Sequence, residues 1–581
     1  MCGILGVRRS LRVDDERFAA ALARLGWRGR DASRRLDVGD WTLGVARLAI
    51  TDRAHDQPIL CARTGRAAVL NGALTDAASQ WPRFADARTR NDTELLLLRL
   101  AADGAFGLAS LHGPHAFAIV DPEQDELWLG RDPCGEKPLY AVQERGRVLA
   151  FASTLPALRA LGWPQPRDDA TRAIALRFGA LPESPKGATG ATVHAVPSGV
   201  FRVRGAGGGL VRTPQAPQPS AAAPFREAFA AAVGRCATAE VGLGLALSGG
   251  IDSACVAAEL ARQDRAPRAF QFCARGEPSD ERARARAVAA HCGLELIAVD
   301  AGPELLDAAP ELAAAAGLPL GDPSVRAVYA LARAAARNGV RVLLSGEGAD
   351  ELFLGYPRHR ALRTLQFVPR ALARTWPAPD PWSMARAARW RRAAAAVDRH
   401  AALLEVAPPA FRARVLAPGF ADGELPALRS SGWAAVRERE LETYLRGDLL
   451  PKLDVAMLAA QVEGRCPFLD PAVLACRELA LAPQAVLGKR PLRAEFAARL
   501  PPGHLAQRKR GFALPLDRWW REDERLAAIL LDPRSLGRRW LRADGVRDCV
   551  ARQRRGELAL GHALWLLVAE ELAERAAEDS A

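Results

Sequence analysis

Residues 243–254, LGLALSGGIDSA, constrain the fold more than any other stretch of the chain. Alternating leucines predict a short buried strand, Ser248, Gly249 and Gly250 predict a tight turn, and a helix is expected from about Asp252 to Arg262. A strand, a glycine turn and a helix N-terminus bring backbone N–H groups together at the positive end of the helix dipole, which favours anion binding. No lysine follows the glycines, so the segment is not the loop typical of γ-phosphate transfer.

The whole sequence divides into three regions that differ in composition and in the spacing of their apolar residues. Residues 1–203 contain short segments of alternating hydrophobicity, which predict a β-rich domain with a few helices. Residues 204–224 are rich in glycine, proline and small side chains that cannot pack a core, so they are interpreted as a linker. Residues 225–581 alternate helical patterns with short apolar runs, which predicts a parallel sheet wrapped by helices, with ligand loops at the carboxyl ends of its strands.

Composition narrows the class of protein. No apolar run reaches the length of a membrane span, and the ten cysteines are scattered without a metal-binding spacing, so a cytoplasmic protein with reduced thiols is expected. The net charge of +13 invites a nucleic-acid interpretation. However, the arginines alternate with acidic residues along helices, which favours solvated helix faces. Five of the 80 basic residues are lysines, so a lysine within a motif draws attention.

The N-terminus offers a second candidate site. Removal of the initiator methionine would give Cys2 a free α-amine beside its thiol, which supplies a nucleophile and a base in one residue. Arg47 could bind a carboxylate, and Asn71 with the Gly72 N–H could form an oxyanion hole. Asp92 could hold an ammonium group. Together these groups would bind an amino acid while the thiolate attacks its side-chain amide.

The motifs in both halves resemble a known family. MCGILG, WRGRD, ARLAITD, LNG, NDTE, GPHAFAIVD and GRDPCGEKPLY are similar to the glutaminase domain of N-terminal-nucleophile amidotransferases. LSGGIDS, LLSGEGADELFLGY, VEGRCPFLD, GKRPLR and KRGF resemble the synthetase domain of glutamine-dependent asparagine synthetase. The resemblance implies a two-domain protein: an N-terminal α+β, β-rich sandwich of the N-terminal-nucleophile type, and a C-terminal α/β parallel-sheet ATP-pyrophosphatase domain with extra helices.

By resemblance, Cys2 would attack glutamine, Arg47 would bind its carboxylate, Asn71 and Gly72 would stabilise the oxyanion, and Asp92 would bind the amine. The chain departs from the family pattern at two positions. Ala73 replaces a glutamate that helps to bind the amine, and Arg30 replaces a proline. The loss of one anionic contact would cost about 1–3 kcal/mol of glutamine binding. A weak or vestigial glutaminase is therefore an open alternative, although retention of the other residues favours activity.

In the second domain, the resemblance assigns the nucleotide site and the catalytic groups. Asp252 and Asp350 are the candidate Mg²⁺ ligands. Glu347 matches the glutamate associated with the acyl-adenylate, where lactam-forming relatives carry tyrosine. Lys489 matches the catalytic lysine, which would neutralise phosphate charge, or is alternatively a solvated lysine at a helix start. Residues 508–511 would contact pyrophosphate or form an exposed basic turn. The predicted ATP-binding residues are Leu247, Ser248, Gly249, Gly250, Asp252, Ser253, Phe272, Ser345 and Gly346.

The expected reaction is the AMP-forming, ATP-dependent conversion of aspartate and glutamine to asparagine and glutamate, with ATP and Mg²⁺ as cofactors. Rival interpretations are a lasso-peptide macrocyclase or related natural-product amide enzyme on the same scaffold, a tRNA-modifying ATPase, and an inactive binding homologue. The expected partners are small molecules, without a membrane or nucleic acid, and a homodimer is left open. The sequence does not identify the acceptor.

Overall fold

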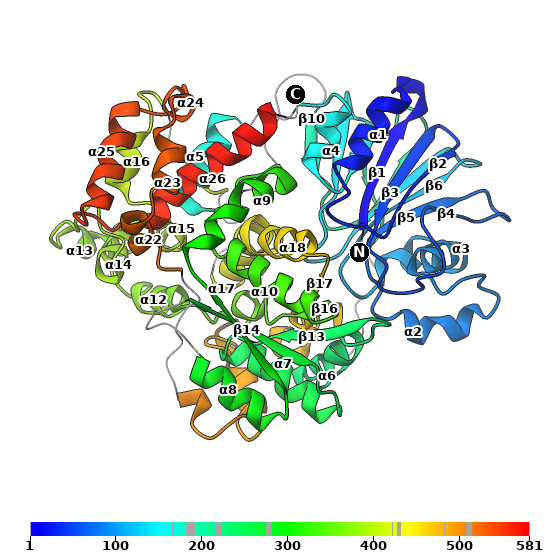
Figure 1. Cartoon of the computed structure of the whole chain (residues 1–581). Coiled ribbons are helices and arrows are strands. Elements are labelled where there is room, and N and C mark those ends of the chain that lie inside the picture. The colour runs from blue at the N-terminus through cyan, green and yellow to red at the C-terminus, as the bar shows by residue number, and fades with distance from the viewer. Residues whose placement is uncertain are drawn as a thin grey trace.

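The computed structural model describes residues 2–164, 168–181, 192–214, 222–274, 282–420, 422–426, 432–480, 483–506 and 514–579. The predicted pyrophosphate contact at residues 508–511 lies outside them. Figure 1 shows the blue N-terminal sheets on one side and the green-to-red C-terminal domain on the other. None of the described helices combines the length and the apolar character that a membrane crossing requires.

The N-terminal domain is built on two antiparallel sheets. The first has the order β10-β8-β9-β1-β3-β2, and the second has the order β12-β11-β7-β6-β5-β4. The strands of the first are β1 Cys2–Arg8, β2 Ala32–Val38, β3 Trp41–Arg47, β8 Tyr140–Glu144, β9 Arg147–Ala152 and β10 Thr192–Ala195. Those of the second are β4 Ile59–Leu60, β5 Ala67–Gly72, β6 His115–Asp121, β7 Glu126–Arg131, β11 Gly199–Arg204 and β12 Val211–Arg212.

The two sheets stack face to face, with a helical layer outside each. Buried side chains from both inner faces, such as Val45 and Val69, form one core. Helices α1 Asp15–Ala23 and α4 Leu155–Ala160 pack on the first sheet, and α3 Asp92–Ala109 packs on the second. The N-terminal half also contains α2 Ala77–Gln80 and α5 Asp169–Phe178. Cys2 begins β1 and pairs with Arg47 at the end of β3, so both residues lie at one edge of the sandwich.

The C-terminal domain contains a five-stranded parallel sheet of order β15-β14-β13-β16-β17. Its strands are β13 Gly242–Ala246, β14 Arg268–Ala274, β15 Leu296–Ala301, β16 Val340–Leu344 and β17 Glu463–Arg465. The chain winds outward from β13 to β15 and then crosses back to β16. The loops after the adjacent strands β13 and β16 therefore face each other at the point where the winding reverses, which is where open α/β sheets bind ligands.

Helices cover both faces of this sheet, as expected for a doubly wound fold. α6 Phe225–Cys236, α7 Ile251–Arg262 and α8 Arg282–His291 lie on one side, and α10 Val325–Arg337 and α18 Leu450–Ala459 lie on the other (Figure 1). The other α-helices of this domain among the described residues are α9 Ala309–Ala316, α11 Ala349–Leu352, α12 Pro357–Leu365, α13 Arg370–Arg374, α14 Arg386–Ala395, α15 Arg399–Leu404, α16 Pro409–Val415, α17 Trp433–Arg439, α19 Pro471–Leu474, α20 Arg477–Ala480, α21 Arg490–Phe496, α22 Leu516–Glu522, α23 Arg525–Leu531, α24 Pro533–Leu536, α25 Ala543–Arg554 and α26 Gly561–Glu578, and a π-helix spans Glu440–Leu449.

The predicted fold class is confirmed in both halves: an antiparallel sandwich is followed by a helix-wrapped parallel sheet. The predicted division at residues 204–224 stays a prediction. Within that range, Arg204 completes β11, and the two residues of β12 pair with β11. α6 then begins at Phe225, where the helical texture was expected.

Candidate active sites

The Cys2 site lies where the ends of β1, β3 and β5 meet. Cys2 is 2% exposed, and its backbone nitrogen donates to the Asn71 side-chain oxygen at 3.4 Å. The Gln57 amide nitrogen lies 3.4 Å from the Cys2 sulfur. The Asn71 Nδ2 group is buried and has no hydrogen-bond partner among the described residues. An unpaired amide donor beside a buried thiol is suited to stabilise the oxyanion that forms when a thiolate attacks a carbonyl carbon.

The other predicted glutamine-binding residues surround the same edge. Arg47 is 4% exposed and contacts Asp56 at 2.9 Å and the Asp52 carbonyl at 2.6 Å. A substrate carboxylate would therefore share this guanidinium with Asp56. Asp92 accepts a hydrogen bond from the Leu74 N–H at 2.9 Å. Burial raises the pKa of Asp92 to about 7, although this hydrogen bond opposes the shift.

The glycine at the oxyanion strand is required by its geometry. Gly72 has φ = 134°, and a Cβ at this position would lie 2.0 Å from the Pro114 carbonyl oxygen. Ala73, which replaces the family glutamate, is 4% exposed and places no carboxylate at the site. Arg30 is exposed, and its backbone N–H donates to Gln461 of the C-terminal domain at 3.0 Å. The second departure therefore lies at the domain contact rather than against the thiol.

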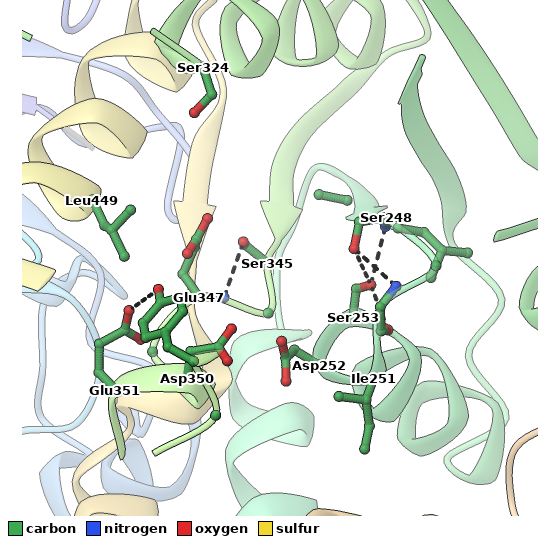
Figure 2. A pocket seen from close by; sticks show the side chains of 18 of the residues that line it. Ser248, Ile251, Asp252, Ser253, Ser324, Ser345, Glu347, Asp350, Glu351 and Leu449 are labelled. Atoms are coloured by element: carbon green, nitrogen blue, oxygen red, sulfur yellow. Dashed lines mark hydrogen bonds between the residues drawn. The ribbon is translucent and has the colours of Figure 1, made fainter. Parts of the chain in front are cut away.

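A cavity of about 510 Å³ lies at the carboxyl edge of the parallel sheet, and all the predicted nucleotide residues line it. Figure 2 shows Ser248, Asp252 and Ser253 on one side of this space and Ser345, Glu347 and Asp350 on the other. The N-cap of α7, Gly250, has no side-chain cap, which leaves the first turn available to an anion. A Cβ at Gly346 would lie 2.8 Å from the Ser253 nitrogen, so the two loops meet only because glycine stands there.

Lys489 connects the two candidate metal ligands. Its Nζ lies 2.6 Å from the Asp252 carboxylate and 2.7 Å from that of Asp350, and its side chain is 3% exposed. Burial lowers the pKa of Lys489, but Asp252 and Asp350 outweigh it and hold the pKa above the ordinary value. The lysine is therefore charged and held next to Asp252, which follows the glycine turn of residues 248–250. This position disfavours the alternative of a solvated lysine at a helix start.

Two carboxyl groups that follow β16 in the chain, Glu347 and Glu351, have raised pKa values. Burial raises the pKa of Glu347, with Lys452 opposing the shift and Asp322 adding to it. Burial together with Asp350 raises the pKa of Glu351 to about 8, although Tyr356 donates a 2.5 Å hydrogen bond to it. Perturbed carboxylates in a cavity are typical of sites that transfer protons.

Sequence reasoning missed a second group of charged residues at the far wall of the cavity. Lys452 on α18 is 5% exposed and binds Asp322 at 2.9 Å, and both line the cavity. Burial opposes ionisation, but Lys452 lowers the pKa of Asp322 to about 2. Arg358 also lines the cavity, and its guanidinium carbon lies 3.8 Å from the ring centroid of Tyr356 and 4.5 Å from that of Tyr444. The scarcity of lysine was the available signal for Lys452, whereas no sequence feature distinguished Arg358.

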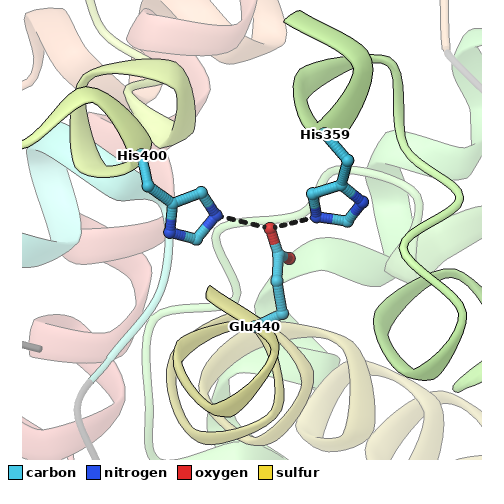
Figure 3. A group of neighbouring side chains, drawn as sticks. All are labelled: His359, His400 and Glu440. Carbon is cyan, nitrogen blue, oxygen red and sulfur yellow. Dashed lines mark hydrogen bonds and ion pairs between the residues drawn. The ribbon is translucent and has the colours of Figure 1, made fainter. Parts of the chain in front are cut away.

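Figure 3 shows a buried cluster of His359, His400 and Glu440, and Glu440 also pairs with Arg358. The Nε2 atoms of His359 and His400 each lie 2.8 Å from one Glu440 oxygen, and Arg358 pairs with both oxygens of the same carboxylate. Two histidines and a glutamate are a potential metal-ligand set. Here the guanidinium already neutralises the carboxylate and would repel a cation. The cluster is better explained as the support that orients Arg358.

The sequence matches two protein-family profiles: residues 1–208 match the glutamine amidotransferase domain, and residues 224–575 match asparagine synthase. A putative asparagine synthetase (glutamine-hydrolyzing) of Mycobacterium tuberculosis H37Rv is 30% identical over 503 residues, covering 75% of this chain and 72% of that protein. Asparagine synthetase (glutamine-hydrolyzing) 1 of Bacillus subtilis 168 is 26% identical over 465 residues, covering 75% and 73%. An amidase, chyE, of Penicillium rubens is 28% identical over 381 residues, covering 58% and 54%. This chain therefore belongs to the asparagine synthase family and carries the glutamine amidotransferase domain in front of the synthase domain.

Proposed function

We propose that this enzyme forms asparagine from aspartate, with ATP as the energy source and glutamine as the nitrogen donor. The family itself implies glutamine and ATP as substrates. The observation that carries the proposal is the cavity in which Lys489 is held between Asp252 and Asp350, next to Glu347 and the glycine turn of 248–250. Products would be asparagine, glutamate, AMP and pyrophosphate.

In the glutaminase half, the Cys2 thiolate attacks the side-chain carbonyl carbon of glutamine. The Asn71 Nδ2–H and the Gly72 N–H donate to the oxyanion, and the amide nitrogen leaves as ammonia once it has gained a proton. Water then cleaves the thioester to release glutamate and regenerate the thiol. The released ammonia would reach the second cavity through the protein, since protonation in bulk water would remove its nucleophilic lone pair.

In the synthetase half, a carboxylate oxygen of aspartate attacks the α-phosphorus of ATP, and the bond to the pyrophosphate oxygen breaks. The Lys489 ammonium stabilises the negative charge that grows on the phosphate oxygens. Ammonia next attacks the acyl carbon and AMP leaves with its bonding electrons. Glu347, whose pKa is raised by burial, is suited to accept the proton that the nitrogen loses.

Carboxylate oxygens are the donors that Mg²⁺ prefers, so Asp252 and Asp350 fit this ion in chemical type. Both line the cavity and both are in contact with Lys489. When bound, Mg²⁺ would neutralise charge on the triphosphate. In this arrangement, the ion and Lys489 would share the two carboxylates.

The far wall of the cavity supports an amino-acid acceptor. Arg358 and Lys452 supply cationic donors suited to an α-carboxylate, and Asp322 supplies an anion suited to an α-ammonium group. Glu347 stands where lactam-forming relatives carry tyrosine, which also favours an intermolecular amide. One relative is named an amidase, so not every protein that is similar to this chain is named an asparagine synthetase. Aspartate is therefore compared directly with larger acids in the test.

The experiment that tests the proposal compares wild type with Cys2→Ala, using aspartate as acceptor and either glutamine or an ammonium salt as nitrogen source. We expect Cys2→Ala to lose glutamine-dependent asparagine formation and to keep ammonium-dependent formation, because the second site requires ammonia and not the thiol. Asparagine, AMP and glutamate are measured separately. The proposal would be wrong if aspartate gave no AMP with either nitrogen source while a peptide carboxylate did. The product would then be a different amide.

The raised pKa of Asp92 predicts a pH dependence of glutamine binding. Above pH 7 the carboxylate is ionised and attracts the glutamine ammonium, whereas below pH 7 it becomes protonated and the attraction is lost. The glutamine KM should therefore rise about tenfold between pH 8 and pH 6. The KM for ATP, measured over the same range, is the control. An Asp92→Asn variant should show a high glutamine KM at both values, and a pH-independent wild-type KM would remove Asp92 from amine binding.

Arg358→Ala should weaken the acceptor without affecting glutamine hydrolysis. Loss of a charge-assisted hydrogen bond of about 1.5–3 kcal/mol predicts a roughly 10- to 150-fold higher aspartate KM. Initial rates with ammonium as nitrogen source give this value, and Arg370→Ala, on exposed α13, is the matched control. An unchanged aspartate KM in Arg358→Ala would contradict the assignment.

A further inference from the structure

A buried ion cluster crosses the boundary between the two domains beside Cys2. Arg28, in the turn after α1, is 1% exposed, and its Nη1 and Nη2 bind the Asp454 carboxylate at 2.7 and 3.1 Å. The Nε–H of Arg28 donates to the carbonyl oxygen of Cys2 at 3.2 Å. One guanidinium therefore joins the residue that carries the nucleophile to a carboxylate of the synthase domain.

Two further contacts fix this arrangement. The Nζ of Lys137 lies 3.3 Å from Asp454, so two cations of the N-terminal domain converge on one buried carboxylate. Burial opposes ionisation of Asp454, but Arg28 and Lys137 hold its pKa below the ordinary value. The Gln461 side chain, just beyond α18, donates to the Trp27 carbonyl at 2.6 Å and accepts from the Arg30 N–H at 3.0 Å. The backbone is thus held on both sides of Arg28.

The helix that carries Asp454 also lines the nucleotide cavity. Lys452 lies two positions earlier on α18 and binds Asp322 in that cavity. Residues two apart on a helix point in widely different directions, so α18 presents Lys452 to the synthetase cavity and Asp454 to the glutaminase site. One turn of α18 therefore lines the synthetase cavity through Lys452 and reaches the Cys2 carbonyl through Asp454 and Arg28.

We propose that Asp454 is a positioning residue for Cys2: through Arg28, the synthase domain holds the nucleophile in its reactive place. The inference rests on the proposed glutaminase activity and goes beyond it, because it makes glutamine hydrolysis depend on a residue of the other domain. A displacement of about 1 Å at a nucleophile is sufficient to slow attack by two orders of magnitude. Asp454 itself does not take part in bond formation.

The test uses the full-length Asp454→Asn variant, which keeps the shape of the side chain and removes its charge. We expect kcat for glutamine hydrolysis to fall about 10- to 100-fold, with less than a twofold change in glutamine KM and in ammonium-dependent synthesis. A purely structural role would reduce the glutamine-dependent and ammonium-dependent rates together. Unchanged hydrolysis, or equal loss of both rates, overturns the inference.

Two more variants sharpen the result. Arg28→Gln and Asp454→Asn should be non-additive, because both act through one contact; additive losses would contradict the proposed relay. Gln461→Asn is a milder change, since Gln461 has φ = 59°, which asparagine tolerates, and the shorter arm cannot bridge Trp27 and Arg30. It should lower the ratio of glutamine-dependent to ammonium-dependent synthesis even if Asp454→Asn folds poorly, and an unchanged ratio counts against the inference.

The matched control is Glu574→Gln. Glu574 of α26 pairs with Arg172 of α5 at 2.5 Å and so joins the same two halves of the chain at a partly buried ion pair distant in sequence from both sites. In Glu574→Gln, the ratio of glutamine-dependent to ammonium-dependent synthesis should equal the wild-type ratio. If wild type releases no glutamate from glutamine, the proposed glutaminase function fails; if wild type does and Asp454→Asn matches it, only this inference fails.

Discussion

The contact of Lys489 with Asp252 and Asp350 is the interaction on which the synthetase cavity depends. Two carboxylates facing one space would repel each other, and a buried ammonium without a partner would be strongly destabilising. Their combination joins the first turn of α7, which follows β13, the first turn of α11, which follows β16, and the start of α21, three segments distant in sequence. Lys489 adopts φ = 63°, a left-handed conformation that costs a non-glycine residue about 1–2 kcal/mol. This backbone conformation occurs at the residue whose ammonium group contacts both Asp252 and Asp350.

The same physical rule organises the rest of the interior: an ionic group is buried where a partner from another segment meets it. Arg28 with Asp454 joins the domains, Lys452 with Asp322 fixes the far wall of the cavity, and Glu440 orients Arg358. Such pairs contribute specificity of arrangement more than net stability, because desolvation offsets much of the attraction. In this chain they determine which charged groups line the cavity and which surround Cys2, and α18 connects two of these pairs across the domain boundary.

The sequence predicted what depends on local pattern. Alternating segments and glycine turns predicted both sheet types, and the motif positions predicted that Asp252, Asp350 and Lys489 would gather around one cavity. Arg28 with Asp454 and Arg358 with Glu440 were not predicted, because their partners lie far away in the chain and arginine is common throughout it. The rarity of lysine was the informative signal, since Lys137, Lys452 and Lys489 each occupy a buried ion pair. The strand β12, Val211–Arg212, was not predicted, because two residues are too few to show a strand pattern within the predicted linker.

Activation of a carboxylate by adenylation in this cavity can be followed with aspartate labelled with ¹⁸O in its side-chain carboxylate. The labelled aspartate is incubated with the enzyme, ATP and ammonium, and the mass of the released AMP is measured. Attack on the α-phosphorus followed by displacement of AMP transfers one labelled oxygen to AMP, so we expect each AMP formed together with asparagine to carry one ¹⁸O. Unlabelled AMP, or label recovered in pyrophosphate, would rule out adenylation of the aspartate side chain.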